Sequence, residues 1–375
     1  MFYPVVSPHN PDYALVACDM TGAFVTKNGG ESWRMFNLRG PVDYFVFDPL
    51  DSNTVYANSI ALFKSADRGN TWSVFYPQPS EIKGVVSKDG AKNIFVAPSS
   101  PKDNRTIYIA WNTSVTRKEN GNWKTNNGPK EVKHLTAYSG GYDQKKNKYI
   151  IYAISGKSYF NPEGDQSGIY YTEDGGETWE NRQEGMLQFR IEGAEIPEWR
   201  SIATSAWHPE VLYVSYNNLQ VHNDTTCIGV ARSEDYGKTW KLSWKDILTK
   251  GGNIPSRNFK SGWINNRFGP TWGENPFSIG VSPVNPDVCY GTDFGRTIKT
   301  VDGGKTWEQV YTNSKQGGGW ISRGLEVTTG YSVVFDPAGR WVIDLGRFRY
   351  KIQRFRFNPL NFDKLGLVIG NTGLE

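Results

Sequence analysis

Short runs of alternating apolar and polar residues recur along the chain, and each is followed by a proline turn and a second apolar run. Alternation with a period of two is typical of strands with one buried face, and a proline turn between two such runs predicts an antiparallel pair. The pattern occurs at 5–16, 45–57, 94–109, 202–213 and 279–290. Pairs of strands at these spacings predict an all-β chain built from repeated units.

A second pattern follows most of these pairs. It consists of Ser or Thr, Asp or Asn two residues on, Gly two further, Ser or Thr two further, and Trp immediately after. It occupies 26–33, 65–72, 172–179, 233–240 and 300–307. A third strand leads into each signature and a fourth begins at its Trp, which is the blade pattern of a β-propeller. We interpret the acidic residue as a scaffold for its own turn, because an Asp there can accept hydrogen bonds from nearby backbone N–H groups.

The spacing of the repeats predicts one β-propeller domain of about seven blades, each a four-stranded antiparallel sheet. The abundance of Gly, Pro, Trp and Tyr (40, 20, 14 and 20 residues) fits many short strands joined by tight turns, with little helix. A degenerate signature at 116–123 lies between the second and third clear ones. The tail has no signature, so the last blade is expected to be irregular or truncated. The predicted blades are roughly 1–40, 41–90, 91–130, 131–195, 196–275, 276–328 and 329–375.

Charge and hydropathy exclude several classes of function. The net charge of +4 is a small excess of 42 basic over 38 acidic residues, and the basic residues are scattered, so nucleic acid is not expected as a partner. No apolar run approaches the roughly 18 to 20 residues that span a bilayer, and no signal peptide is recognised in this chain. Neither metal-spaced histidines nor a phosphate loop is found, so no metal and no cofactor are expected.

One register of the repeat carries acidic residues at the end of the sheets opposite the signatures. Asp19, Asp165 and Asp293 each lie seven residues before the first Ser or Thr of a signature, and Asn58 holds that place in the second blade. A third strand of about six residues, at ~3.3 Å each, puts them ~20 Å from the signature turn. Two carboxylates facing one another across a cleft are what glycosidic bond cleavage needs. The alternative is that each Asp only ties its own loop.

The signatures are similar to those of the Asp-box propellers, which include sialidases, xyloglucan-processing endoglucanases, sortilin-type receptors and photosystem assembly factors. Residues 19–24 resemble the motif around the catalytic base of the xyloglucanase family, and 291–295 resemble the motif around its catalytic acid. The resemblance implies a glycoside hydrolase in which Asp19 is the general base and Asp293 the general acid. It also favours a secreted or periplasmic location, which the chain itself leaves open. A sialidase is disfavoured because the expected early Phe-Arg-Ile-Pro motif is absent.

The chain departs from the xyloglucanase pattern in one respect, because that family draws its two acids from two propellers, whereas both candidates here lie in one array. A second propeller outside this chain is therefore one expectation. The other expectation is that a different carboxylate of this chain replaces one of the two acids, namely Glu274, Asp43 or Asp165. A non-catalytic propeller that binds a glycan or protein on the same face is the alternative function. Side chains expected to contact a carbohydrate there are Trp111, Trp199, Trp263, Trp272, Trp320, Arg39 and Arg200.

Overall fold

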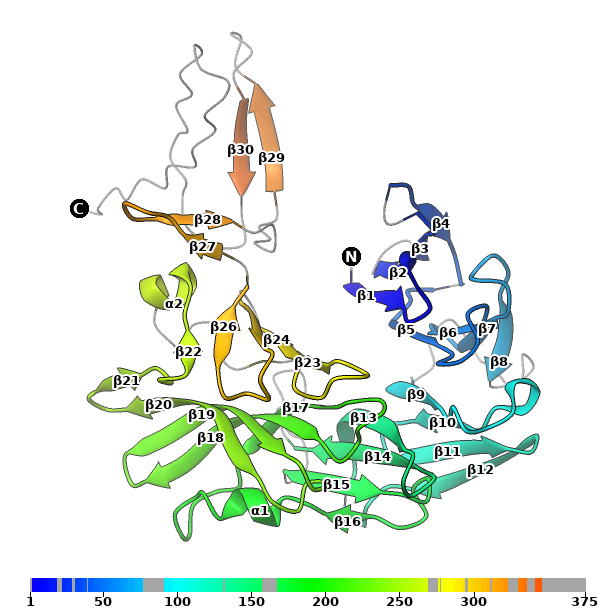
Figure 1. The fold of residues 1–375 in the computed structure, drawn as a ribbon, viewed down its shortest axis with the longest axis horizontal. Coiled ribbons are helices and arrows are strands. Elements are labelled where there is room, and N and C mark those ends of the chain that lie inside the picture. The colour runs from blue at the N-terminus through cyan, green and yellow to red at the C-terminus, as the bar shows by residue number, and fades with distance from the viewer. Residues whose placement is uncertain are drawn as a thin grey trace. The chain divides into compact units, whose positions relative to one another are not determined.

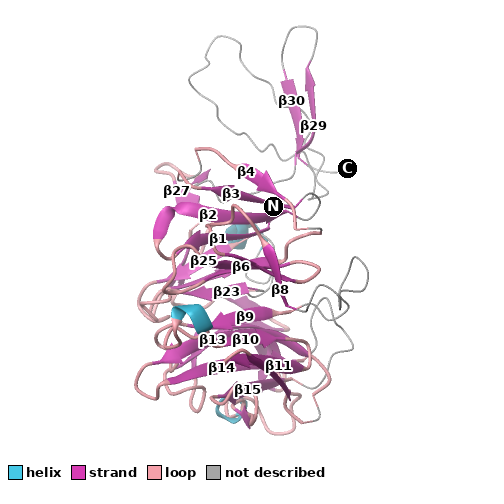
Figure 2. Ribbon diagram, turned by 90° about the vertical axis from the view of Figure 1, so that its right-hand side faces the viewer, coloured by secondary structure: helices cyan, strands magenta, loops and turns pink. Residues whose placement is uncertain are grey.

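The computed structural model describes residues 2–18, 22–28, 31–38, 40–76, 91–130, 132–156, 167–268, 276, 278–293, 296–310, 312–322, 330–335 and 341–345. The chain divides into two compact units, residues 1–309 and 310–375. In its described residues the first unit contains six sheets that follow one another in chain order, and all strand pairs but one are antiparallel (Figure 1). Figure 2 shows how little of the described chain is helical. Neither helix in it is long and apolar enough to cross a membrane.

The first three sheets have four strands each, ordered as in the sequence. The first comprises β1 (Phe2–Ser7), β2 (Asn10–Cys18), β3 (Gly22–Thr26) and β4 (Arg34–Phe36). The second comprises β5 (Tyr44–Phe47), β6 (Val55–Asn58), β7 (Leu62–Ser65) and β8 (Ser73–Tyr76). The third comprises β9 (Asn93–Val96), β10 (Ile107–Ala110), β11 (Ser114–Glu119) and β12 (Asn122–Asn127).

The next two sheets carry longer connections. The fourth comprises β13 (Leu135–Asp143), β14 (Lys148–Ser155), β15 (Gly168–Thr172) and β16 (Glu180–Asn181), followed by the short helix α1 (Glu184–Leu187). The fifth comprises β17 (Glu198–Thr204), β18 (Leu212–His222), β19 (Thr225–Ser233), β20 (Lys241–Thr249) and β21 (Gly252–Ile254).

The sixth sheet recruits a strand from the connection before it. It comprises β22 (Phe259–Lys260), β23 (Ser278–Val281), β24 (Cys289–Thr292), β25 (Thr297–Thr300) and β26 (Trp307–Gln309), with α2 (Trp263–Phe268) between β22 and β23. β22 was placed by the sequence in the range of the fifth blade, but it pairs with β26 of the sixth, and in parallel. The ring of Phe259 lies 5.1 Å from that of Trp244, which explains why this short strand seats where the two blades meet.

The described residues of the second unit form two hairpins. They are β27 (Thr312–Ser314) with β28 (Trp320–Ser322), and β29 (Gly330–Phe335) with β30 (Trp341–Leu345).

The prediction of an all-β propeller with antiparallel blades is confirmed, and the fifth and sixth sheets each have a fifth strand beyond the four that were predicted. Six blades are described in place of about seven, and most of the expected seventh, 329–375, lies outside the described residues. That the whole chain forms one domain stays a prediction.

The first strands of the sheets bring the blades together. β1 lies beside β5, β9 beside β13, β13 beside β17 and β17 beside β23. Between the sheets the core is filled by large side chains such as Trp199, Trp244 and Tyr216, all at most 1% exposed. Each sheet therefore buries apolar residues against its neighbours, as a propeller requires.

The Asp-box turns have the scaffold role that the sequence indicated. Asp67 accepts hydrogen bonds from the backbone N–H groups of Asn70 and Thr71 at 3.0 and 2.9 Å, and from the hydroxyl of Thr71 at 2.6 Å. The hydroxyl of Ser65 completes the set at 2.8 Å. Corresponding bonds surround Asp174, Asp235 and Asp302. Because each turn occupies its own carboxylate, the boxes fix the third-to-fourth strand connections and mark one end of the sheets, called here the box face.

Candidate active site

The end of the sheets opposite the boxes, called here the loop face, carries the connections between second and third strands. Asn58 ends β6 and Asp293 follows β24, so both lie at this end, as their register predicted. The other two residues at this register, Asp19 and Asp165, lie outside the described residues. Three further candidates from the sequence also lie outside them, namely Glu274, Trp272 and Arg39.

Asp293 is bound within its own loop by Arg296. The backbone N–H and Nε of Arg296 donate to the two carboxylate oxygens at 2.7 and 2.6 Å, and the backbone N–H of Asp293 donates to the carbonyl of Arg296 at 3.1 Å. The two side chains are 2% and 0% exposed. A buried guanidinium at this distance favours the ionised carboxylate. A general acid has to carry a proton, so this geometry favours the loop-tying alternative for Asp293.

A second buried carboxylate lies within electrostatic reach of Arg296. Asp246, in β20, accepts hydrogen bonds from the indole of Trp244 at 3.0 Å and from the backbone N–H of Ser256 at 2.8 Å. Its Oδ2 has no hydrogen-bond partner among the described residues. Burial raises the pKa of the Asp246 carboxyl, and Arg296 opposes that rise. The sequence analysis missed Asp246, and its only signal there is an acidic residue two positions after a Trp in an apolar strand.

Asp43 is held in place by Asn58. It lies at the surface just before β5, where Nδ2 of Asn58 donates to its Oδ2 at 2.7 Å. Its backbone N–H also donates to the carbonyl of Asn58 at 2.9 Å, so main chain and side chain are both fixed. Partial burial raises the pKa of the Asp43 carboxyl, which the Asn58 amide and the more distant Lys92 oppose. A carboxyl held in place with a raised pKa is suited to general acid chemistry.

The fifth blade repeats this arrangement with Glu198. Glu198 begins β17, and its carboxylate accepts hydrogen bonds from the side chains of Asn217 and Asn218 at 3.4 and 3.2 Å. Arg200 pairs with the same carboxylate at 3.2 Å, and its side chain is 10% exposed. The signal in the sequence is an acidic residue at the start of a first strand and an Asn at the paired position of the second.

The tryptophans expected to bind sugar have different environments. Trp199 is 1% exposed and belongs to a core cluster, so its ring has no face for a carbohydrate, and this expectation is corrected. Trp111 is half-buried and donates to the hydroxyl of Thr116 at 2.8 Å, with its ring against Tyr76. Trp263 is half-buried in α2. Trp320 is 37% exposed and belongs to the second compact unit.

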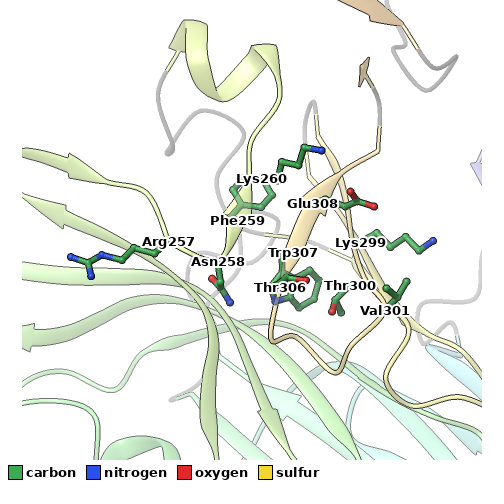
Figure 3. A pocket seen from close by; sticks show the side chains of 10 residues that line it. All are labelled: Arg257, Asn258, Phe259, Lys260, Lys299, Thr300, Val301, Thr306, Trp307 and Glu308. Atoms are coloured by element: carbon green, nitrogen blue, oxygen red, sulfur yellow. The ribbon is translucent and has the colours of Figure 1, made fainter. Parts of the chain in front are cut away.

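A hollow of about 390 Å³ lies at the outer strands of the sixth blade (Figure 3). Phe259 and Trp307, from the paired strands β22 and β26, lie side by side there, while Lys260 and Lys299 contribute positive charge. Glu308 supplies the one carboxylate among the lining residues, and two are needed for acid and base catalysis of glycoside hydrolysis. In the described part of the chain, no three His, Cys, Asp or Glu side chains gather as a metal site would require.

Comparison with known proteins agrees with the propeller fold and finds similarity to xyloglucanases. A BNR/Asp-box repeat matches residues 170–181. The chain is 23% identical over 356 residues to xyloglucanase Xgh74A of Acetivibrio thermocellus, a match that covers 80% of this chain and 37% of that protein. The structure is similar to that of the GH74 xyloglucanase from Xanthomonas campestris, with a TM-score of 0.59 and 15% identity, covering 92% of this chain and 50% of the other.

Another solved structure matches this chain over nearly the full length of both proteins. YCF48 from Cyanidioschyzon merolae aligns with a TM-score of 0.50 and 12% identity, covering 91% of each chain. The present chain thus spans about half the length of the GH74 structure and nearly the whole of YCF48. It is an Asp-box β-propeller whose sequence and fold are similar to those of xyloglucanases.

Proposed function

We propose that the chain is a glycoside hydrolase acting on xyloglucan or a related polysaccharide, with its acid and base on the loop face of the first two blades. The similarity in sequence to a xyloglucanase supports the substrate class. The observation that carries the proposal is the carboxyl of Asp43, which is fixed by Asn58 and has a raised pKa. Asp19, one of the three residues between β2 and β3, is the proposed base on the strength of its motif.

In the proposed reaction, Asp43 protonates the glycosidic oxygen as the bond from that oxygen to the anomeric carbon breaks. Asp19 takes a proton from a water molecule whose oxygen attacks the anomeric carbon. Asn58 occupies Oδ2 of Asp43, which leaves Oδ1 to carry and donate the proton. After turnover the proton on Asp19 returns to solvent and Asp43 is reprotonated. Asp293 takes no direct part and holds its loop through Arg296.

Release of reducing ends from xyloglucan and from a panel of other β-glucans tests this proposal. Asp43→Asn and Asp19→Asn are each expected to lower kcat at least 100-fold, as is usual for loss of a general acid or base. Asp103→Asn, which alters an exposed carboxylate in the turn Lys102–Asn104, is the control and should turn over at the wild-type rate. Full turnover by Asp43→Asn, or no release by the wild-type chain from any glucan of the panel, would overturn the proposal.

A non-catalytic propeller that binds a glycan or a protein is the second candidate. It is supported by the ion pair between Asp293 and Arg296, which favours the ionised form of the carboxyl that resembles the family's general acid. Affinity electrophoresis in gels containing xyloglucan separates the two functions. Retardation of the wild-type chain without any release of reducing ends supports binding alone, whereas release that depends on Asp43 supports the hydrolase.

A further inference from the structure

A hollow of about 320 Å³ opens at the box face where the first two blades meet, at the end of the sheets opposite Asp43 and Asp293. Both blades contribute to it, the first through the turn between β1 and β2 and the box after β3, the second through its first turn and its box. Its lining residues are Ser7, His9, Asn10, Tyr13, Lys27, Ser52 and Arg68.

Cationic side chains gather at this hollow without acidic partners. Nζ of Lys27 donates to Oδ1 of Asn70 at 2.9 Å, and Nε of Arg68 donates to Oδ1 of Asn53 at 2.9 Å. Arg34, beside them, donates to a backbone carbonyl at 2.8 Å. Among the described residues none of these three forms an ion pair with a carboxylate. Partial burial and the charges of Arg34 and Arg68 lower the pKa of Lys27, and the charge of Asp67 opposes them.

The nearby carboxylate, that of Asp67, does not neutralise this charge by direct contact. Its oxygens accept hydrogen bonds from Ser65, Asn70 and Thr71 inside the box turn. Asp67 therefore acts on the cations only at a distance. An anion entering the hollow would meet lysine and arginine donors that at present contact neutral oxygens.

Tyr13 provides an independent sign that a ligand belongs here. Its side chain is 4% exposed, and its hydroxyl has no hydrogen-bond partner among the described residues. Burying a hydroxyl without a partner is costly, and such groups are rare in native proteins. The hydroxyl lies against the Gly69 turn, since a methyl group on Gly69 would approach it to 3.3 Å. The hydroxyl is therefore next to the turn that carries Arg68, and Tyr13 is one of the residues that line the hollow.

Arg68 also occupies a backbone position that costs free energy. Its φ is +59°, whereas the equivalent residues of two other boxes are Gly175 and Gly303, with φ of +74° and +72°. A non-glycine residue in this region is strained by roughly 1 kcal/mol or more. Tyr236 holds the same position in the box of the fifth blade, where its hydroxyl donates a hydrogen bond to the carboxylate of Asp143. A side chain at this position thus serves an interaction beyond its own turn.

We propose that this hollow binds a phosphate or sulfate group through Lys27, Arg68 and the hydroxyl of Tyr13. The guanidinium and ammonium groups supply charge-assisted hydrogen bonds, and the buried hydroxyl gains the partner it lacks. The volume exceeds what one inorganic anion fills, so a phosphorylated or sulfated sugar fits the site as well as free phosphate or sulfate does.

Isothermal titration of the full chain with inorganic phosphate, sulfate and glucose 6-phosphate, at low ionic strength, tests the proposal. Saturable binding is expected, with the ester tighter if the sugar also contacts the hollow and equal to phosphate if the site recognises the oxyanion alone. Three variants are informative: Arg68→Gly, Lys27→Met and Tyr13→Phe. The first two should raise Kd at least about 10-fold and the third about 5-fold, as expected for charged and neutral hydrogen bonds.

The variants are chosen so that loss of binding is separable from loss of folding. Arg68→Gly introduces the residue found at this position in three other boxes, and Tyr13→Phe removes an unpartnered hydroxyl, so both should unfold at or above the wild-type temperature. Lys238→Met is the control for charge. It removes an exposed lysine from the box of the fifth blade and should leave Kd unchanged. The proposal would be overturned if none of the three anions bound saturably. It would also be overturned if all three variants bound with the wild-type Kd.

Discussion

The indole Nε1 of Trp240 donates a hydrogen bond to the carbonyl oxygen of Arg182 at 3.1 Å, which joins the box of the fifth blade to the end of the fourth. In the same way, the indole of Trp179 in the fourth blade donates to Asn127 of the third, and that of Trp307 in the sixth donates to Ser243 of the fifth. In the second blade the ring of Trp72 stacks on that of Phe36 of the first, with the ring centres 5.3 Å apart. The tryptophan of each of these boxes therefore connects a blade to the one before it.

Replacing Trp240 by Ala should lower the free energy of unfolding by about 3 to 5 kcal/mol, because a large ring that is 4% exposed leaves a cavity between blades. The matched variant is Trp33→Ala in the first box, whose ring is 45% exposed and which should cost less than about 1 kcal/mol. Urea unfolding of both variants, followed by tryptophan fluorescence and by circular dichroism, measures the difference. Equal losses would show that the joint between blades contributes nothing beyond the turn itself.

Asp67 should make stability depend on pH in the acid range. Hydrogen bonds from Thr71 and its neighbours lower the pKa of Asp67 from 3.8 to about 2 in the folded protein. The folded state therefore binds the proton less readily than the unfolded state, so this stabilisation is present above about pH 4 and is lost as pH falls toward 2.

Asp67→Asn isolates that contribution. The first box already has Asn28 in this position, where its amide donates to the hydroxyl of Ser32 at 2.9 Å and its oxygen accepts the backbone N–H of Ser32 at 3.0 Å. The variant should keep the turn and unfold with a weaker dependence on pH between 4 and 2 than the wild type, measured by urea midpoints at each pH. A slope identical to that of the wild type would contradict the assignment.

Asp293→Asn should destabilise the protein whether or not the chain is an enzyme. Removing one charge of a buried pair takes away the carboxylate that Nε of Arg296 contacts, and such changes cost about 3 kcal/mol or more. Urea unfolding measures the loss, with the exposed Asp103→Asn as control. Wild-type stability combined with lost turnover would instead return Asp293 to the role of general acid.

The parts of the structure that were predicted correctly depend on contacts close in sequence. The bonds that the Asp of a box accepts join residues at most four apart, so the signature contains the information that forms the turn. The register of Asn58 and Asp293 on the loop face follows from counting along one strand. The ion pair of Asp293 with Arg296 is local as well, but the sequence does not say that the pair is buried.

Contacts between blades could not be read in this way. Trp199 is buried because packed elements cover its side of β17, and Asp246 is influenced by Arg296, fifty residues away in the next blade. Asp43 and Asn58 are 15 residues apart, and their contact depends on the pairing of β5 with β6. The candidate site is therefore a property of tertiary packing, whereas the scaffold is a property of the repeat.

Two glycines in first strands report where one blade packs closely on another. A methyl group at Gly141, in β13, would lie 2.5 Å from the carbonyl oxygen of Ser205 in the fifth blade, whereas at Gly280, in β23, no atom lies within 4 Å. Gly141→Ala must push the two blades apart and should cost about 2 kcal/mol or more, typical of overpacking against backbone. Gly280→Ala should be neutral or stabilising by about 0.5 kcal/mol, since alanine loses less backbone entropy on folding. Thermal unfolding of the two variants side by side measures the contrast. An equal loss in both would mean that another part of the protein covers β23 as closely as the fifth blade covers β13.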